Sequence, residues 1–135
     1  MKIEKQVCSL ELANRLSVLG VPQLGAFVWR ERKYNEKMPR VSLFDSYDDG
    51  MYSVEGWEIV ASAFTVAELG ELLPTEQNDR LGFFSGRAIN GWFCEVKNYG
   101  VMPFERLHVE LQHDTEANAR AAMLIYLIEN NHIKV

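Results

Sequence analysis

The sequence predicts an α+β fold, in which a largely antiparallel sheet of about five or six strands is combined with three helices. Strand-like segments are grouped between helical segments, and tight-turn sequences separate several of these strands. No internal repeat, low-complexity tract or Pro/Gly linker divides the 135 residues, which is the length of one ordinary domain. We therefore expect residues 1–135 to form a single domain.

The first helix is predicted over residues 9–19, because apolar side chains recur there at helical spacing. Ser9 is a suitable N-cap, and Gly20 suits the left-handed position that commonly follows a helix. The apolar stripe consists of Leu12, Ala13, Leu16 and Leu19.

A first group of strands is predicted from residues rich in β-branched and aromatic side chains. These strands cover residues 26–31, 41–45 and 57–61. The polar segment 32–40 contains Pro39 and is expected to be a loop or a hairpin tip. Asp49-Gly50 is suited to a tight turn before the third strand.

A short central helix is predicted over residues 65–73, with both ends marked in the sequence. Thr65 is the expected N-cap, and Glu68 three residues later completes a capping box. Pro74 disfavours helical geometry at the preceding residue and so ends the helix.

A second group of strands follows a polar loop at 75–80. Asn90-Gly91 between residues 83–89 and 92–97 is a strong hairpin signal. Residues 106–112 alternate between apolar and polar side chains, which is typical of a strand with one buried face and one wetter face.

The last helix is predicted over Glu116–Glu129, after an N-cap at Thr115. It is apolar over most of its circumference, so we expect it to be buried on two sides. The second covering surface is either the domain itself or another subunit, and a homo-oligomer formed through this helix stays open. The apolar residues are Ala117, Ala121, Met123, Leu124, Ile125, Tyr126, Leu127 and Ile128.

Composition points to a globular protein of a reducing compartment. Apolar residues make up 47% and charged residues 24% of the chain, and no apolar run is long enough to span a membrane. Cys8 and Cys94 have no C-x-x-C spacing, which indicates plain buried thiols. We expect a cytoplasmic protein without membrane contact.

Five segments resemble a family of small uncharacterised phage and prophage proteins. The central block 63–74 is the most specific of them. The resemblance implies a layered α/β/α sandwich carried on mobile elements of bacterial genomes. Because the family has no established activity, the resemblance assigns no functional residue. The other four segments are 8–13, 19–23, 27–29 and 119–130, and the chain departs most from the family in 32–56 and 75–90.

Signatures of catalysis and metal binding are weak. The chain has no G-x-S-x-G, H-E-x-x-H or P-loop motif, and the acidic run 45–49 lacks the alternating spacing of a calcium loop. His108 and Glu110 share a predicted strand face and form a possible base and its orienting group, although such pairs are more often an exposed polar face. We expect neither enzyme activity nor a cofactor or metal.

Two kinds of binding fit the remaining signals. Net charge is +4 over residues 1–40 and −9 over the remainder, and segment 29–40 interleaves aromatic and basic residues as single-stranded nucleic-acid binders do. Acidic residues within that segment and in the rest of the chain oppose a polyanion, so this is the alternative. A non-catalytic protein-interaction module with an unknown protein partner is preferred, since the tryptophans supply anchors. The candidate binding surface is Trp29, Arg30, Arg32, Lys33 and Tyr34.

Overall fold

The computed structural model describes residues 2–32, 38–44, 57–74, 81–98 and 108–135. The predictions for 33–37, for the Asp49-Gly50 turn and for the loop 75–80 lie outside these ranges. The elements, in chain order, are η1 (Ile3–Lys5), α1 (Leu10–Val18), β1 (Phe27–Arg32), β2 (Arg40–Leu43), β3 (Trp57–Ser62), α3 (Val66–Leu72), β4 (Leu81–Ala88), β5 (Gly91–Asn98), β6 (His108–His113) and α5 (Glu116–Glu129).

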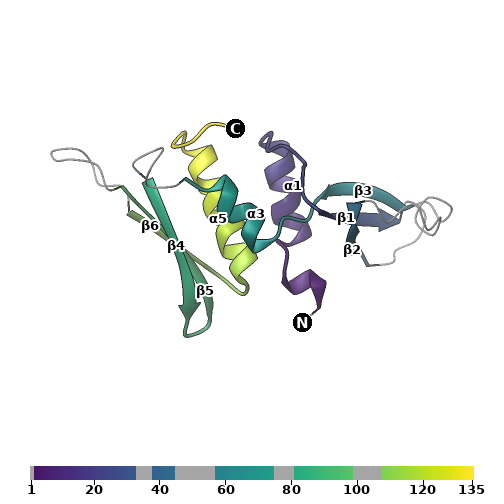
Figure 1. The fold of residues 1–135 in the computed structure, drawn as a ribbon, viewed down its shortest axis with the longest axis horizontal. Helices are drawn as coiled ribbons and strands as arrows, with labels where there is room; N and C mark the ends of the chain where they lie inside the picture. The colour runs from purple at the N-terminus through teal and green to yellow at the C-terminus, as the bar shows by residue number, and fades with distance from the viewer. Residues whose placement is uncertain (1, 33–37, 45–56, 75–80, 99–107) are drawn as a thin grey trace.

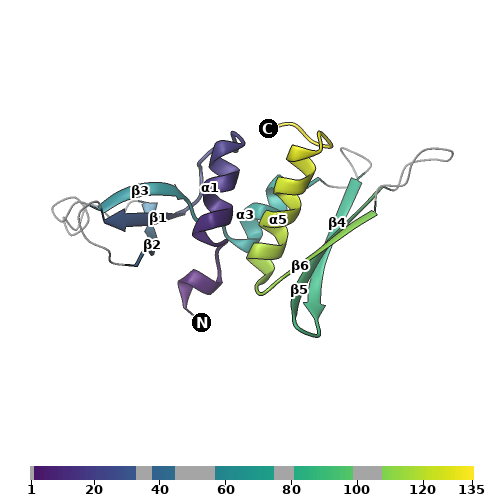
Figure 2. The ribbon, with the colours of Figure 1, turned by 180° about the vertical axis from the view of Figure 1, so that it is seen from behind.

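The described strands form two antiparallel sheets of three strands each, β2-β1-β3 and β4-β5-β6. Both views in Figures 1 and 2 show the helices between the two sheets, with α1 on the side of β1–β3 and α5 on the side of β4–β6. The predicted α+β class, the three α-helices and the antiparallel pairing are thereby confirmed within the described chain.

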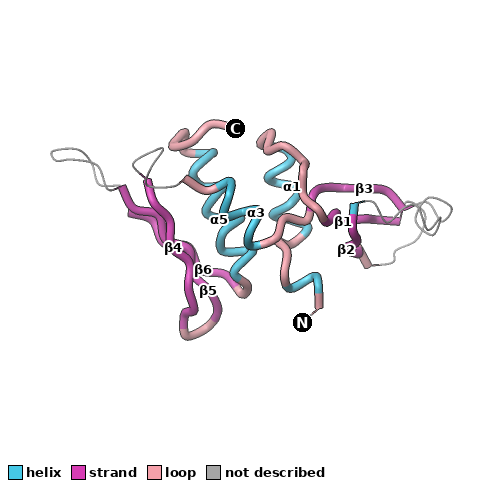
Figure 3. Tube along the Cα trace, viewed as in Figure 1, coloured by secondary structure: helices cyan, strands magenta, loops and turns pink. Residues whose placement is uncertain are grey.

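The order of the layers differs from the expected α/β/α sandwich. The strands make two sheets rather than one, and the cyan helices of Figure 3 separate the magenta strands into two outer layers. The reason lies in the connections. β3 leads within three residues to the N-cap of α3, so the chain leaves the first sheet after β3. In the first sheet β1 pairs antiparallel with both β2 and β3, and in the second sheet β5 pairs antiparallel with both β4 and β6.

Helix α1 begins at the predicted cap, where the Ser9 hydroxyl accepts a hydrogen bond from the Leu12 N–H at 3.4 Å. Gly20 has φ +89°, the left-handed conformation that ends the helix. The buried side of α1 consists of Ala13 and Leu16, which join the same core as the sheet residues.

The capping box of α3 is formed as predicted. The Glu68 N–H donates to Thr65 Oγ1 at 3.2 Å, and the Thr65 N–H donates to Glu68 Oε2 at 2.8 Å. The second carboxylate oxygen of Glu68 accepts from the Ala26 N–H at 2.8 Å. The start of α3 is therefore tied to the residue that precedes β1.

Strands β4 and β5 form the predicted hairpin, with its turn at Ile89-Asn90, one residue earlier than Asn90-Gly91. Gly91 has φ +150°, and a Cβ built on it would lie 2.4 Å from the carbonyl oxygen of His113. Glycine is required here both by the backbone conformation and by the close approach of β6.

Helix α5 packs against the β4–β6 sheet on one side and against α1 and α3 on the other. Most of the apolar circumference predicted from the sequence is therefore buried inside the domain, while Tyr126 and Ile128 are half-buried. A homo-oligomer through this helix stays a prediction. Within the described chain, no helix is long and apolar enough to cross a membrane. The buried residues of α5 are Ala117, Ala119, Ala121, Met123, Leu124, Ile125 and Leu127.

Replacing Gly91 by Ala is expected to lower the free energy of unfolding by about 2–4 kcal/mol, because it combines a strained φ with a backbone clash. Urea denaturation followed by circular dichroism measures the change. Asn90→Ala in the same exposed turn is the control, and its effect should stay within about 0.5 kcal/mol. Equal effects of the two substitutions would contradict this account of the turn.

Candidate functional site

The structure buries two of the five residues predicted to form a binding surface. Trp29 is 8% exposed, and its indole N–H donates to the Cys8 carbonyl oxygen at 2.9 Å. Arg30 is 3% exposed, and its Nε donates to Ser42 Oγ at 2.7 Å. The side chain of Arg32 and the whole of Lys33 and Tyr34 lie outside the described residues.

The burial of Trp29 and Arg30 has a tertiary cause. Trp29 lies between Val41 on β2 and Ala61 on β3 in the sheet register, on the face that belongs to the core. On the other face, the Arg30 guanidinium also donates to the Phe44 carbonyl oxygen at 3.3 Å. Neither side chain presents the exposed surface that nucleic-acid stacking or phosphate contact requires.

Of the three tryptophans, Trp29 and Trp57 are buried and Trp92 is half-buried. It lies at the start of β5, with the Arg87 guanidinium carbon 5.3 Å from the centre of its ring. This cation–π contact covers one face of the indole ring. Trp92 also lines a surface cleft, which makes it the tryptophan placed to contact a ligand.

The cleft has a volume of about 410 Å³ and lies where the N-terminal ends of α3 and α5 meet η1 and the first residues of β1 and β5. Its walls come from five segments that are distant in the sequence. The apolar lining residues are Ile3, Phe27, Val66, Ala67, Trp92 and Ala117, and the polar ones are Lys5, Gln6, Thr65, Asp114, Thr115 and Glu116.

Several polar groups of the cleft are already engaged within the fold. The hydroxyls of Thr65 and Thr115 cap their own helices. Asp114 accepts a hydrogen bond from Asn118 Nδ2 at 2.8 Å, and this bond holds the pKa of Asp114 below its usual range. These side chains therefore stabilise the two helix ends.

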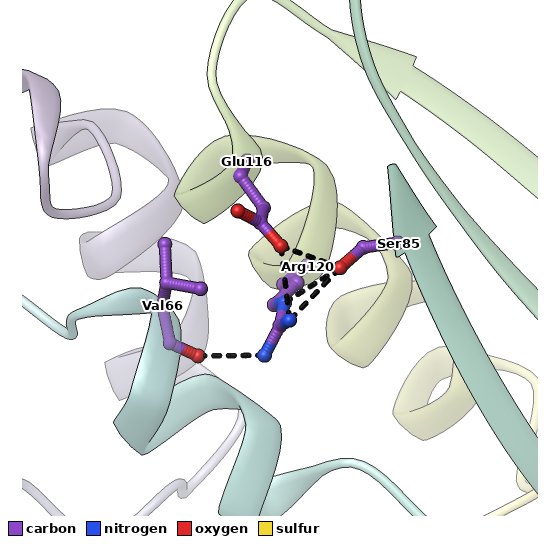
Figure 4. Close-up of polar contacts among 4 residues, drawn as sticks. All are labelled: Val66, Ser85, Glu116 and Arg120. Atoms are coloured by element: carbon purple, nitrogen blue, oxygen red, sulfur yellow. Dashed lines mark hydrogen bonds and ion pairs between the residues drawn. The ribbon is translucent and has the colours of Figure 1, made fainter. Parts of the chain in front are cut away.

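Glu116 belongs to a polar network that joins α3, α5 and β4 (Figure 4). Its Oε1 accepts from Ser85 Oγ at 2.6 Å and from Arg120 Nη2 at 2.9 Å. Arg120 also donates to Ser85 Oγ from Nε and Nη2 at 3.0 and 2.9 Å, and from Nη1 to the Val66 carbonyl oxygen at 2.9 Å. Its guanidinium carbon lies 5.2 Å from the centre of the Phe83 ring.

A hydroxyl beside a carboxylate is an arrangement that can serve catalysis, but this one is a closed structural network. Both Ser85 and Glu116 are bound to the same guanidinium, and that guanidinium is anchored to the α3 backbone through Val66. The geometry therefore supports a structural role, in which Arg120 holds α3 in place against α5 and β4.

The remaining titratable candidates are separate from the cleft. His108 Nε2 lies 3.5 Å from Glu95 on the neighbouring strand, so Glu95 is its carboxylate neighbour rather than the predicted Glu110. Glu95 also lies 2.7 Å from Lys97 Nζ, a contact that lowers the pKa of Glu95. Among the described residues, no three His, Cys, Asp or Glu side chains are grouped to hold a metal ion.

Both cysteines are buried free thiols, as predicted. Burial raises the pKa of Cys8 from 9.0 to about 11 and that of Cys94 from 9.0 to about 12. A thiol held in its protonated form is a poor nucleophile. Neither cysteine is therefore suited to covalent catalysis.

No protein-family model matches this chain, and neither a curated protein nor a solved structure matches it.

The Arg120 network predicts the effect of a change on α3. A Cβ on Gly70 would lie 2.6 Å from Arg120 Nη1, so Gly70→Ala must displace the guanidinium from its partners. Alanine in place of glycine favours a helix by about 1 kcal/mol, but the loss of the Arg120 hydrogen bonds outweighs this gain. We expect a net loss of about 1–2 kcal/mol in the free energy of unfolding of Gly70→Ala. Urea denaturation of the purified variants measures this change.

The control for Gly70→Ala is the same substitution in an Arg120→Met background, where the obstructing nitrogens are absent. There it should become neutral or stabilising by up to about 1 kcal/mol. An equal loss of stability in both backgrounds would show that Arg120 is not the cause.

The two thiols should react with a disulfide reagent at pH 8 only after the protein unfolds, and two per chain should then react. Burial keeps both thiols protonated to a higher pH in the folded state than in the unfolded state. The stability that comes from this difference in pKa is fully present below about pH 9 and is lost as the pH rises towards 11. Absorbance of the released thiolate, with and without urea, tests the first statement. Reaction of either thiol at the same rate without urea would contradict it.

Proposed function

We propose that this protein is a non-catalytic protein-interaction module, and that the cleft between the ends of α3 and α5 receives an apolar or aromatic side chain of a partner protein. One observation carries the proposal. The cleft is open and lined by apolar side chains, while the helix caps and the Arg120 network engage several of its polar groups.

The size and lining of the cleft support an anchoring role. A volume of about 410 Å³ accommodates one or two large side chains. Partner anchors of this kind commonly supply much of the binding energy of an interface. Phe27, Val66 and Trp92 offer apolar contact, while the exposed Lys5 and Asp114 add one charge of each sign.

A polar substrate would be oriented by donors and acceptors that converge on it. In this cleft the hydroxyl groups of Thr65 and Thr115 serve the backbone of their own helices, and the carboxylate of Glu116 is held by Ser85 and Arg120. This arrangement favours recognition by shape and apolar contact over the turnover of a small polar molecule.

The resemblance to phage and prophage proteins supports a cytoplasmic accessory role on a mobile element. The alternative is weak binding of single-stranded nucleic acid through segment 29–40. The burial of Trp29 and Arg30 weakens this alternative, and the net charge of −5 opposes it. It would then depend on the other basic residues of that segment.

Ala67 offers a direct test, because it is exposed at the start of α3 and lines the cleft. Ala67→Trp is expected to fill the cleft while leaving the core intact. Peptides selected from a combinatorial library on the wild-type protein should share an apolar anchor, and their affinity for Ala67→Trp should fall at least about tenfold by calorimetry. Glu71→Trp, on the same helix outside the cleft, is the control and should bind these peptides as the wild type does.

Two results would overturn the proposal. Peptides that bind the wild type and Ala67→Trp equally would place the binding surface elsewhere. Failure to select any peptide, together with oligonucleotide binding that weakens steeply with salt and is lost on replacing Arg30, Arg32 and Lys33 together, would favour the alternative.

A further inference from the structure

The outer edge of β4 is unusual among the sheet edges that the structure describes. β4 pairs only with β5 among the described strands, over eight residues and without a break in register. It contains no proline or lysine, and Arg87 is its one charged residue. A long, regular edge of this kind is a template for pairing with another strand.

The three other described edges have features that oppose such pairing. β2 is four residues long, and the pairing of β3 with β1 shifts in register at Trp29/Arg30. β6 exposes His108, Glu110 and Gln112. Proteins commonly protect sheet edges with short strands, bulges and charged or polar side chains. Among the described edge strands, β4 is neither short nor broken in register, and Arg87 at one end is its one charged side chain.

The hairpin turn shows which backbone groups of β4 face outward. Ala88 and Gly91 flank a two-residue turn and form its hydrogen-bonded closing pair. Since these pairs alternate along an antiparallel ladder, the N–H and C=O groups of Phe83, Ser85 and Arg87 face away from β5. Along the described chain these groups are available to another strand.

The exposed face of β4 has a shape that complements itself. Phe84 is 63% exposed and stands between Gly82 and Gly86 on that face. The ring of Phe93 already lies over Gly86, where a Cβ would be 3.2 Å from it, and the centres of the Phe84 and Phe93 rings are 5.7 Å apart. Each large ring therefore has a glycine beside it.

We propose that β4 pairs antiparallel with β4 of a second copy of this chain, about a two-fold axis at Ser85. In this register, Phe84 lies opposite Gly86 of the second copy, and the two phenylalanine pairs join into one exposed aromatic cluster. The result is a continuous six-stranded sheet across the dimer. β4 contributes no residue to the cleft, so a test of this dimer is independent of a test of the proposed function.

The charges of β4 are compatible with this pairing. The axis places Arg87 opposite Phe83 of the second copy, so the two Arg87 residues are four positions apart along the ladder, about 14 Å. That separation exceeds the screening length of about 10 Å at moderate salt. No like charges on β4 face each other across the new interface.

Sedimentation velocity over a dilution series tests the proposal directly. The wild type should have twice the mass of the chain at high concentration. The amides of Phe83, Ser85 and Arg87 should exchange hydrogen more slowly as concentration rises. A protein that stays monomeric throughout, or a dimer in which these three amides show no concentration dependence, would overturn the proposal.

Arg87→Pro removes an N–H that faces the second copy, while proline is tolerated on the free side of an edge strand. It should raise the dimer dissociation constant at least about tenfold. Arg87→Ala, which removes the same side chain and its contact with Trp92, is the matched control and should remain dimeric.

A second pair of variants keeps the test decisive if Arg87→Pro fails to fold. Phe84→Lys places a charge at the exposed centre of β4 and should give a folded monomer. Ile89→Lys places the same charge in the adjacent turn and should leave the dimer intact. A dimer that persists in Phe84→Lys would show that the copies associate through another surface.

Discussion

The burial of α5 on two sides is the constraint on which the rest of the structure depends. One side of the helix covers the β4–β6 sheet, and the other supports α1 and α3. Alanines at 117, 119 and 121 are fully or nearly fully buried, which allows close packing over the first half of the helix. Because one helix serves both halves, the two sheets can occupy opposite ends of the molecule and still share a single core cluster.

Arg120 is the one basic residue of this helix, and its position explains why a guanidinium lies among the packed elements. It lies where α5, α3 and β4 meet, and its partners come from all three elements (Figure 4). Lysine has one nitrogen and lacks this planar set of donors. Gly70 on α3 completes the arrangement by leaving space for the guanidinium. The same network fixes Glu116 and Val66 in the walls of the cleft.

Local signals in the sequence predicted much of the fold, because the interactions concerned span few residues. The Thr65–Glu68 capping box and the Asn90-Gly91 hairpin are examples, and the alternation in β6 is another. The layer order was not predictable in this way. The pattern of α5 shows that the helix is covered on both sides, but it does not show which element lies on each side.

The candidate site was harder to predict than the fold for a related reason. In the sequence, Arg30 belongs to the basic and aromatic segment 29–40, which predicts an exposed side chain. Its burial depends on contacts with Ser42 and Phe44 in the folded structure. The cleft residues Ile3, Phe27 and Trp92 come from segments with no shared motif. Their proximity is a property of the assembled core, so a single sequence contains no local sign of it.

The N-terminal segment is fastened to the last helix, and this has a consequence for biosynthesis. The Ser9 N–H donates to Asn118 Oδ1 at 2.7 Å across 109 positions of sequence, and Arg15 forms an ion pair with Glu129. A nascent chain therefore cannot complete the packing of α1 until α5 has left the ribosome. During synthesis the first sheet and α1 therefore keep apolar surface exposed to solvent until α5 is available. In this period the chain is most prone to aggregate and most exposed to chaperone binding.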